Sequence, residues 1–146
     1  MNKINPHRLK KVHFIGIGGI GVSALARMML LEGKKVSGSD ATLSEITAEL
    51  SVRGVTIHEG HDRVHVPREC DLVVYSPAVR GNNPELLFAR ELGIPTYSYP
   101  EMLGRISKGK KTIAISGSHG KTTTTAMLAE VFVHAKKDPT VVVGSV

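Results

Sequence analysis

The chain has 146 residues, of which 41% are hydrophobic and only 4% aromatic, and its formal net charge is +6. That length fits one ordinary domain, and the apolar fraction excludes a disordered chain. The scarcity of aromatic residues argues against stacking platforms for single-stranded nucleic acid, although the positive charge keeps nucleic-acid binding as an alternative. No apolar run approaches the ~20 residues of a membrane span, and the N-terminus lacks a signal-peptide core. We therefore expect a soluble, cytoplasmic protein that binds neither nucleic acid nor a membrane.

Apolar runs and helix-period segments alternate along the chain. Strands are predicted at residues 12–17, 35–39, 55–58, 71–75 and 94–97, and helices at 20–31, 44–53, 84–92 and 100–106. The helix limits are marked by Ser44 as an N-cap, Pro84 in a first turn, and glycines that follow the last turns. Such alternation predicts a parallel sheet with helices on both faces, the doubly wound α/β class.

A first glycine turn follows the first predicted strand. Its pattern Gly-x-Gly-x-x-Gly places glycines at Gly16, Gly18 and Gly21, at the start of a predicted helix. Asp40 ends the second strand nineteen residues after Gly21, close to the spacing of a ribose-binding acid. This predicts a bound diphosphate nucleotide, either a dinucleotide such as NAD or a UDP-sugar, because the spacing does not choose the base. A tight turn with no ligand is the alternative.

A second glycine turn lies within the stretch TIAISGSHGKTTTT, residues 112–125. An apolar strand is predicted to end at Ser116, and Lys121 with four threonines begins a helix. The turn departs from the general P-loop pattern, because Ile115 stands where that pattern has its first glycine. It still predicts a nucleoside triphosphate site, with Lys121 on the β- and γ-phosphates and the Thr122 hydroxyl on Mg²⁺. A Gly/Ser loop with a solvent-facing lysine is the alternative. The predicted phosphate-binding residues are Gly117, Ser118, His119, Gly120, Lys121, Thr122 and Thr123.

Two such turns divide the chain into two parts. Residues 1–107 are predicted to form a complete Rossmann-like domain, and residues 108–146 the first βαβ unit of a P-loop-type ATPase domain, with its second strand at 140–143. One strand, one helix and a few further residues cannot bury a parallel sheet. We therefore expect the chain to be the N-terminal portion of a longer protein.

Three histidines, His58, His61 and His65, have a spacing that could suggest a metal site. Gly60 interrupts any helix that would align them, so a loop near the surface is favoured. In that loop, Gly60 and His61 could still border the nucleotide crevice.

With both glycine turns considered, the chain resembles the Mur ligases of peptidoglycan synthesis, and most of all the alanine-adding members. The matching stretches run in the family's order from His13 to Leu128: HFIGIGGIGVSALA, VSGSD, DLVVYSPAV, NPELLFARELGIP, EML and SGSHGKTTTTAML. The resemblance implies that the first domain binds the UDP part of UDP-N-acetylmuramate rather than NAD. The residues implied for this site are Gly16, Ile17, Gly18, Gly19, Ile20, Gly21, Ser39, Asp40 and Ser76.

The resemblance also implies a reaction, the ATP-dependent joining of L-alanine to UDP-N-acetylmuramate. The substrate carboxylate would attack the γ-phosphate of ATP, and the amine of L-alanine would displace phosphate from the acyl phosphate. Lys121 would be the catalytic residue that stabilises the transferring group together with Mg²⁺. Ser118 stands where the family commonly has threonine, and the hydroxyl is kept.

Length is the main departure from the family. The complete enzymes carry the rest of the ATPase domain and a third domain, so we expect this chain to bind the UDP-sugar without turnover. A ligase that recycles a tripeptide onto the same UDP-sugar is one alternative, and a non-catalytic UDP-sugar or dinucleotide-binding protein is another. The residues do not predict an oligomeric state.

Overall fold

The computed structural model describes residues 8–143. Its main part is a five-stranded sheet in the order β3-β2-β1-β4-β5, in which every neighbouring pair is parallel. The strands are β1 (Lys11–Ile15), β2 (Lys35–Asp40), β3 (Thr56–Glu59), β4 (Leu72–Tyr75) and β5 (Thr96–Ser98). The helices between them are α1 (Ile20–Leu31), α2 (Glu45–Val52), α3 (Pro84–Glu91) and α4 (Tyr99–Ser107). The predicted α/β class is confirmed.

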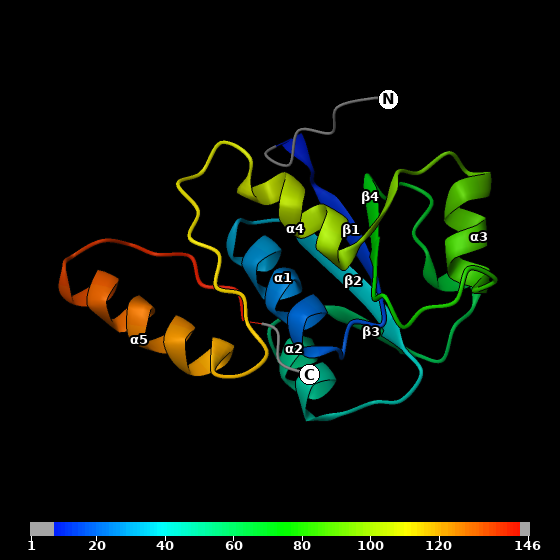
Figure 1. Ribbon diagram of the computed structural model, residues 1–146. Helices are drawn as coiled ribbons and strands as arrows, with labels where there is room; N and C mark the ends of the chain where they lie inside the picture. The colour runs from blue at the N-terminus through cyan, green and yellow to red at the C-terminus, as the bar shows by residue number, and fades with distance from the viewer. Residues whose placement is uncertain (1–7, 144–146) are drawn as a thin grey trace.

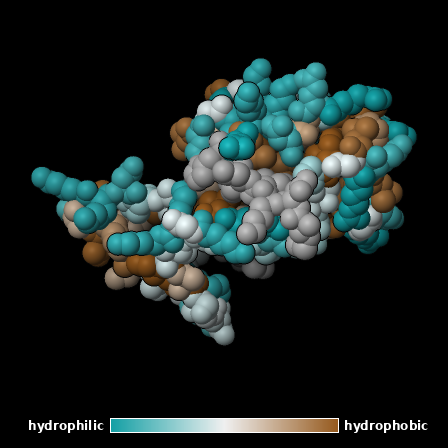
Figure 2. Space-filling model, turned by 90° about the horizontal axis from the view of Figure 1, so that it is seen from above, coloured by the Kyte–Doolittle hydropathy of each residue, from teal (hydrophilic) through white to brown (hydrophobic). Residues whose placement is uncertain are grey.

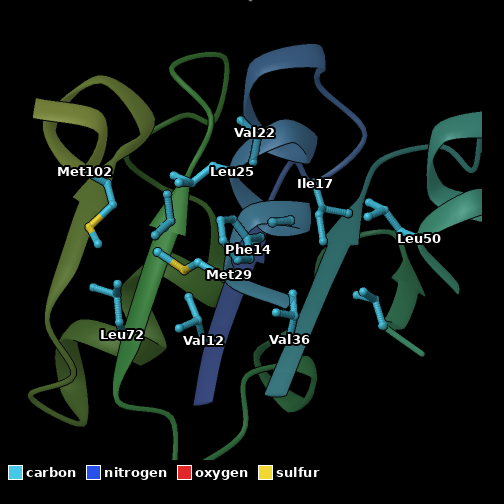
Figure 3. Packing of buried hydrophobic residues seen from close by; sticks show 13 residues of the cluster. Val12, Phe14, Ile17, Val22, Leu25, Met29, Val36, Leu50, Leu72 and Met102 are labelled. Carbon is cyan, nitrogen blue, oxygen red and sulfur yellow. The ribbon is translucent and has the colours of Figure 1, made fainter. Parts of the chain in front are cut away.

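Helices cover both faces of the sheet (Figure 1). On one face, α1, α2 and α4 pack against alternate residues of the strands, such as Val12 and Phe14 of β1. Figure 3 shows Phe14 and Met29 of this cluster between α1 and the sheet, with Leu50 of α2 and Met102 of α4 on either side. On the other face, α3 packs against Ile15 of β1 and Val73 of β4. Since helices cover both faces of the sheet, the central strand β4 is a continuous apolar run, and β1 is apolar and buried from Val12 to Ile15 except for the buried His13.

Local capping explains where these helices begin and end. The Ser44 hydroxyl accepts a hydrogen bond from the Thr47 N–H, and the Thr47 hydroxyl accepts one from the Ser44 N–H, which forms a capping box at the start of α2. Asn83 caps α3, and Pro84 occupies its first turn. Gly33 follows α1 with a φ of 79°, a left-handed conformation that glycine adopts without strain. The limits predicted for α1 are those observed.

The C-terminal part differs from the prediction. Helix α5 (Lys121–His134) forms, but the segments at 112–116 and 140–143, which were predicted to be strands, have no strand pairing. The two segments flank a hollow of about 590 Å³ beside α5, lined in part by Ile113, Leu128 and Phe132. A parallel strand pair needs further strands to bury both of its faces, and the described residues supply none there. The predicted βαβ unit is therefore corrected to a helix between two unpaired segments.

Helix α5 projects from the sheet domain (Figure 1) and contains no fully buried residue. Met127 and Val131 are 66% and 62% exposed. Apolar side chains are visible on this projecting part in Figure 2. The sheet domain thus has its own core, whereas α5 lacks one.

This contrast predicts a difference in amide exchange. Amides of residues 108–143 should exchange at least about tenfold faster than the ladder amides of β1 and β4, because local opening around α5 exposes little additional apolar surface. Hydrogen–deuterium exchange read by mass spectrometry would measure both regions in one sample, with α1 as the internal helical control. Equal protection of α1 and α5 would contradict the expectation.

Candidate functional site

A crevice of about 730 Å³ opens at the carboxyl ends of β1, β2 and β4. In the sheet order, β2 and β4 lie on opposite sides of β1, so the connection after β1 runs to β2 and the connection after β4 runs to β5, in opposite directions. Such a switch point is where open α/β sheets bind ligands, because the loops on its two sides separate. The crevice is lined by Gly16, Gly18, Gly19, Asp40, Ala41, Thr42, Ser44, His61, Ser76, Ala78, Val79, Arg80, Asn82, Asn83 and Pro84.

The first glycine turn forms one wall of this crevice. Gly16 has a φ of 76°, and its N–H donates to the Ser39 carbonyl at 2.8 Å. A Cβ atom on Gly16 would lie 2.9 Å from the Cβ of Ser76. Gly19 begins α1 without a side-chain cap, so the first N–H groups of α1 have no side-chain acceptor. Uncapped N–H groups at a helix N-terminus favour an anion such as a diphosphate.

Asp40 is held against the same turn. Its Oδ2 accepts a 2.7 Å hydrogen bond from the Gly18 N–H, and a Cβ on Gly18 would lie 2.9 Å from this oxygen. The second glycine of the motif therefore allows the carboxylate at the end of β2 to approach the turn. Asp40 lines the crevice, and its role as a ribose-binding acid stays a prediction.

The remaining residues predicted for this site divide into two groups. Ser76 lines the crevice together with Gly16, Gly18 and Gly19. Ile17 is fully buried in the core, and the Ser39 hydroxyl is buried and donates inward to Glu85. A Cβ on Gly21 would lie 2.7 Å from the Tyr99 ring, so the third glycine serves the packing of α1 against α4. Ile20 is half exposed but is not among the residues that line the crevice.

Sequence reasoning missed several residues of the crevice wall, among them Arg80 and Asn83. Arg80 follows β4. It is the one arginine or lysine among the described residues that line the crevice, so it gives the wall a permanent positive charge. The Oδ1 of Asn83 accepts hydrogen bonds from the Glu85 and Leu86 N–H groups, which fixes the start of α3 at the crevice. Asn83 directly precedes the helix predicted at 84–92, and no local pattern marks Arg80 as a site residue.

Beneath the crevice lies a buried network centred on Glu85. Its Oε2 accepts hydrogen bonds from Nε2 of His13 and Oγ of Ser39, both at 2.8 Å. Its Oε1 lies 3.2 Å from Nδ1 of His61. Burial raises the pKa of Glu85, but the hydrogen bonds from His13, Ser39 and His61 outweigh burial and leave this pKa below its ordinary value. Glu85 is thus a fully buried carboxylate that is held ionised.

The three histidines predicted to lie in a surface loop are close to this network. His58 and His65 stack with ring centroids 4.4 Å apart, and burial lowers the pKa of His58. Within residues 8–143 no group of histidine, cysteine and acidic side chains is arranged to hold a metal ion. His61 lies at the crevice, as the sequence allowed.

The second glycine turn brings its predicted residues together at the start of α5. Gly120 is the N-cap in a left-handed conformation, with a φ of 75°, and provides no side-chain cap. Nζ of Lys121 donates to the Gly117 carbonyl at 2.5 Å, so the ammonium group lies over the turn. The side chains of this turn are exposed, including Thr122 and Thr123. The chemistry of these groups suits a phosphate with a bound Mg²⁺. Uncapped N–H groups and an ammonium group can bind phosphate oxygens, and an exposed hydroxyl oxygen can coordinate Mg²⁺.

No helix among the described residues has the length and the apolar character needed to cross a bilayer. Together, the parallel sheet, the glycine turn and the crevice at its switch point define a Rossmann-like α/β domain.

Comparisons with known proteins specify the family. The sequence profile of the protein family described as "Mur ligase family, catalytic domain" matches residues 11–111. A UDP-N-acetylmuramate–L-alanine ligase from Clostridium kluyveri is 52% identical over 136 residues, which cover 92% of this chain and 30% of that protein. The crystal structure of the UDP-N-acetylmuramate–alanine ligase MurC from Thermotoga maritima superposes with a TM-score of 0.82 at 40% identity, over 88% of this chain and 30% of that one. A murein peptide ligase from Psychrobacter arcticus gives a TM-score of 0.77 at 32% identity, over 87% and 27%.

The chain belongs to the Mur ligase family. It spans about 30% of the length of the curated relatives it matches.

The lowered pKa of Glu85 predicts an acid-dependent stability. The folded-state pKa lies below the ordinary value of 4.5, so ionised Glu85 stabilises the fold above that pH. This contribution is lost as the pH falls through the folded-state pKa. Glu85→Gln should therefore lower the free energy of unfolding by roughly 1–3 kcal/mol near neutral pH. The difference from the wild type should shrink at about pH 3.

Urea denaturation of both proteins at several pH values would measure this difference. Glu91→Gln, on the exposed end of α3, is the matched control and should change stability little at any pH. A Glu85→Gln deficit that stayed constant down to pH 3 would show that Glu85 has no depressed pKa.

Proposed function

We propose that this chain is the UDP-sugar-binding part of an ATP-dependent ligase of peptidoglycan precursor synthesis, which joins L-alanine to UDP-N-acetylmuramate. The observation that carries the proposal is the crevice at the β1–β4 switch point, in a chain 52% identical to an L-alanine ligase named for this substrate. The murein peptide ligase supports the tripeptide-recycling alternative, but its 32% identity is lower than the 40% of the MurC structure.

The diphosphate of the UDP-sugar would bind at the turn from Gly16 to Gly19, facing the N-terminus of α1. The geometry supports this because the turn leaves uncapped N–H groups at the crevice. Arg80, on the opposite wall, would supply the positive charge that a diphosphate needs. Asp40, at the end of β2, would accept hydrogen bonds from the ribose.

The second turn would bind the phosphates of ATP. Lys121 would move from the Gly117 carbonyl to the phosphates, and Thr122 would provide an oxygen ligand for Mg²⁺. Bound Mg²⁺ would neutralise charge on the phosphate oxygens. In this arrangement Lys121 is the catalytic residue, because its ammonium group stabilises the charge that develops during phosphoryl transfer. His119 lies in the same turn and could contact phosphate.

Residues 1–146 alone would bind the UDP-sugar without completing the reaction. The chain covers about 30% of its relatives, and the second turn has no paired sheet beneath it among the described residues. A catalytic constellation needs such support to hold its groups in place.

Calorimetric titration tests the crevice assignment. UDP-N-acetylmuramate should bind with measurable affinity, whereas NADH should not, because the proposed site is built for a nucleotide sugar. Arg80→Ala should weaken the binding by roughly tenfold or more, since it removes a charge-assisted hydrogen bond. Arg105→Ala, with its guanidinium over the Tyr97 ring, is the control and should bind as the wild type does. Binding of NADH alone would mean that the site is a dinucleotide site.

Phosphate release tests the second part of the proposal. With ATP, Mg²⁺, UDP-N-acetylmuramate and L-alanine present, this chain should release no phosphate above the rate of a Lys121→Ala variant. Release that depends on both substrates would overturn the proposed lack of turnover and support the assignment of a ligase.

A further inference from the structure

The network around Glu85 reaches the crevice through His61. The His61 side chain is 24% exposed, lines the crevice, and directs its Nδ1 inward at Oε1 of Glu85 and Oγ of Ser39, at 3.2 and 3.1 Å. The Ser39 backbone carbonyl accepts the Gly16 N–H. His61 is therefore connected through one residue to the glycine turn of the proposed diphosphate site.

The hydrogen bonds determine which nitrogen of His61 carries a proton. An ionised carboxylate only accepts hydrogen bonds, so Oε1 of Glu85 requires a donor. The Ser39 hydroxyl gives its proton to Oε2 of Glu85, so its oxygen also acts as an acceptor toward His61. Both inward partners being acceptors, Nδ1 of His61 must carry the hydrogen.

This arrangement leaves Nε2 of His61 available to a ligand. Within residues 8–143, Nε2 of His61 makes no hydrogen bond. It is also not a buried atom that lacks a partner, since the one such side-chain atom in these residues is Nδ1 of His65. Nε2 of His61 is thus open to solvent on a ring that lines the crevice. With Nδ1 already protonated, a proton on Nε2 makes the ring an imidazolium.

We propose that His61 is a diphosphate-binding residue that donates from Nε2 as an imidazolium, and that Glu85 is the positioning residue that holds its Nδ1–H. The inference rests on the proposed binding of a nucleoside diphosphate in the crevice. The imidazolium then lies between two negative groups, the buried carboxylate and the phosphate, and each stabilises its charge. Binding takes up a proton from solution.

Charged and titratable groups surround His61 from several elements. Acidic side chains come from α3 (Glu85) and from the end of β2 (Asp40). Basic side chains come from β1 (His13), from β3 (His58), from the 3-10 turn at Arg63–His65 (His65), and from the far wall of the crevice (Arg80). The diphosphate adds negative charge at the Nε2 side of the His61 ring, and the proposed proton uptake is the response to that added charge.

The substitution His61→Asn tests the role of Nε2, because an asparagine amide can replace Nδ1–H toward Glu85 but has no atom at Nε2. Calorimetry with UDP in two buffers of different ionisation enthalpy measures affinity and proton uptake together. We expect the wild type to take up a proton and His61→Asn to bind UDP at least about tenfold more weakly, without that uptake. His65→Asn is the matched control, since His65 also faces Glu85 but does not line the crevice. It should bind UDP as the wild type does.

A second variant tests the positioning role. Glu85→Gln should weaken UDP binding in the same direction, and nitrogen NMR of the imidazole should show that His61 loses its preference for Nδ1–H. The same spectra report whether the variant is folded.

The outcomes separate the two proposals. If the wild type binds UDP and His61→Asn matches it in affinity and proton uptake, the inference is overturned and the proposed crevice stands. A wild-type His61 without the Nδ1–H tautomer would also overturn it. If the wild type does not bind UDP, the proposed function fails, and this inference fails with it.

Discussion

The carboxylate of Glu85 must find hydrogen bonds inside the protein, because it is fully buried where α3 meets the central strands. An unpaired buried charge is strongly destabilising, so the partners of Glu85 have to be in place when the domain folds. Those partners come from β1, β2 and the segment after β3, that is, from His13, Ser39 and His61. The carboxylate therefore fixes the position of α3 relative to β1, β2 and the segment that follows β3. The positions of Asn83 and Pro84 on the crevice wall follow from this.

Much of the fold could be predicted because its signals are local. Ser44 and Asn83 cap helices through their own side chains, and Gly33 ends α1 by its left-handed backbone. Capping and helix periodicity act within a few residues, which is the range that a sequence pattern covers. Strand alternation with these helices was enough to predict the parallel sheet. The strand expected at 112–116 was wrong, because an apolar run becomes a strand only where a neighbour completes its hydrogen bonds.

The site could be predicted only in part. Gly16, Gly18 and Asp40, which the motif spacing grouped as one site, line the same crevice, because the motif and the acid follow adjacent strands. The burial of Glu85 could not be predicted, because an acidic residue in the first turn of a helix is also favourable when it is exposed on the surface. The local sequence does not distinguish an exposed acid from a buried one. The glycine pattern could not choose the ligand, because the same turn accommodates the diphosphate of any nucleotide and does not contact the base. The choice of a UDP-sugar came from the resemblance.

The contact between Gly21 and Tyr99 limits which substitutions can be tolerated at these two positions during evolution. A Cβ at position 21 would lie 2.7 Å from the Tyr99 ring, so a larger residue there is tolerated only if the ring withdraws or is replaced by a smaller side chain. A single substitution at position 21 would separate α1 from α4 and so disturb the core around Met102. Positions 21 and 99 are thus expected to vary as a pair across relatives. The third glycine of the motif would then follow the evolution of the helix interface rather than that of the ligand.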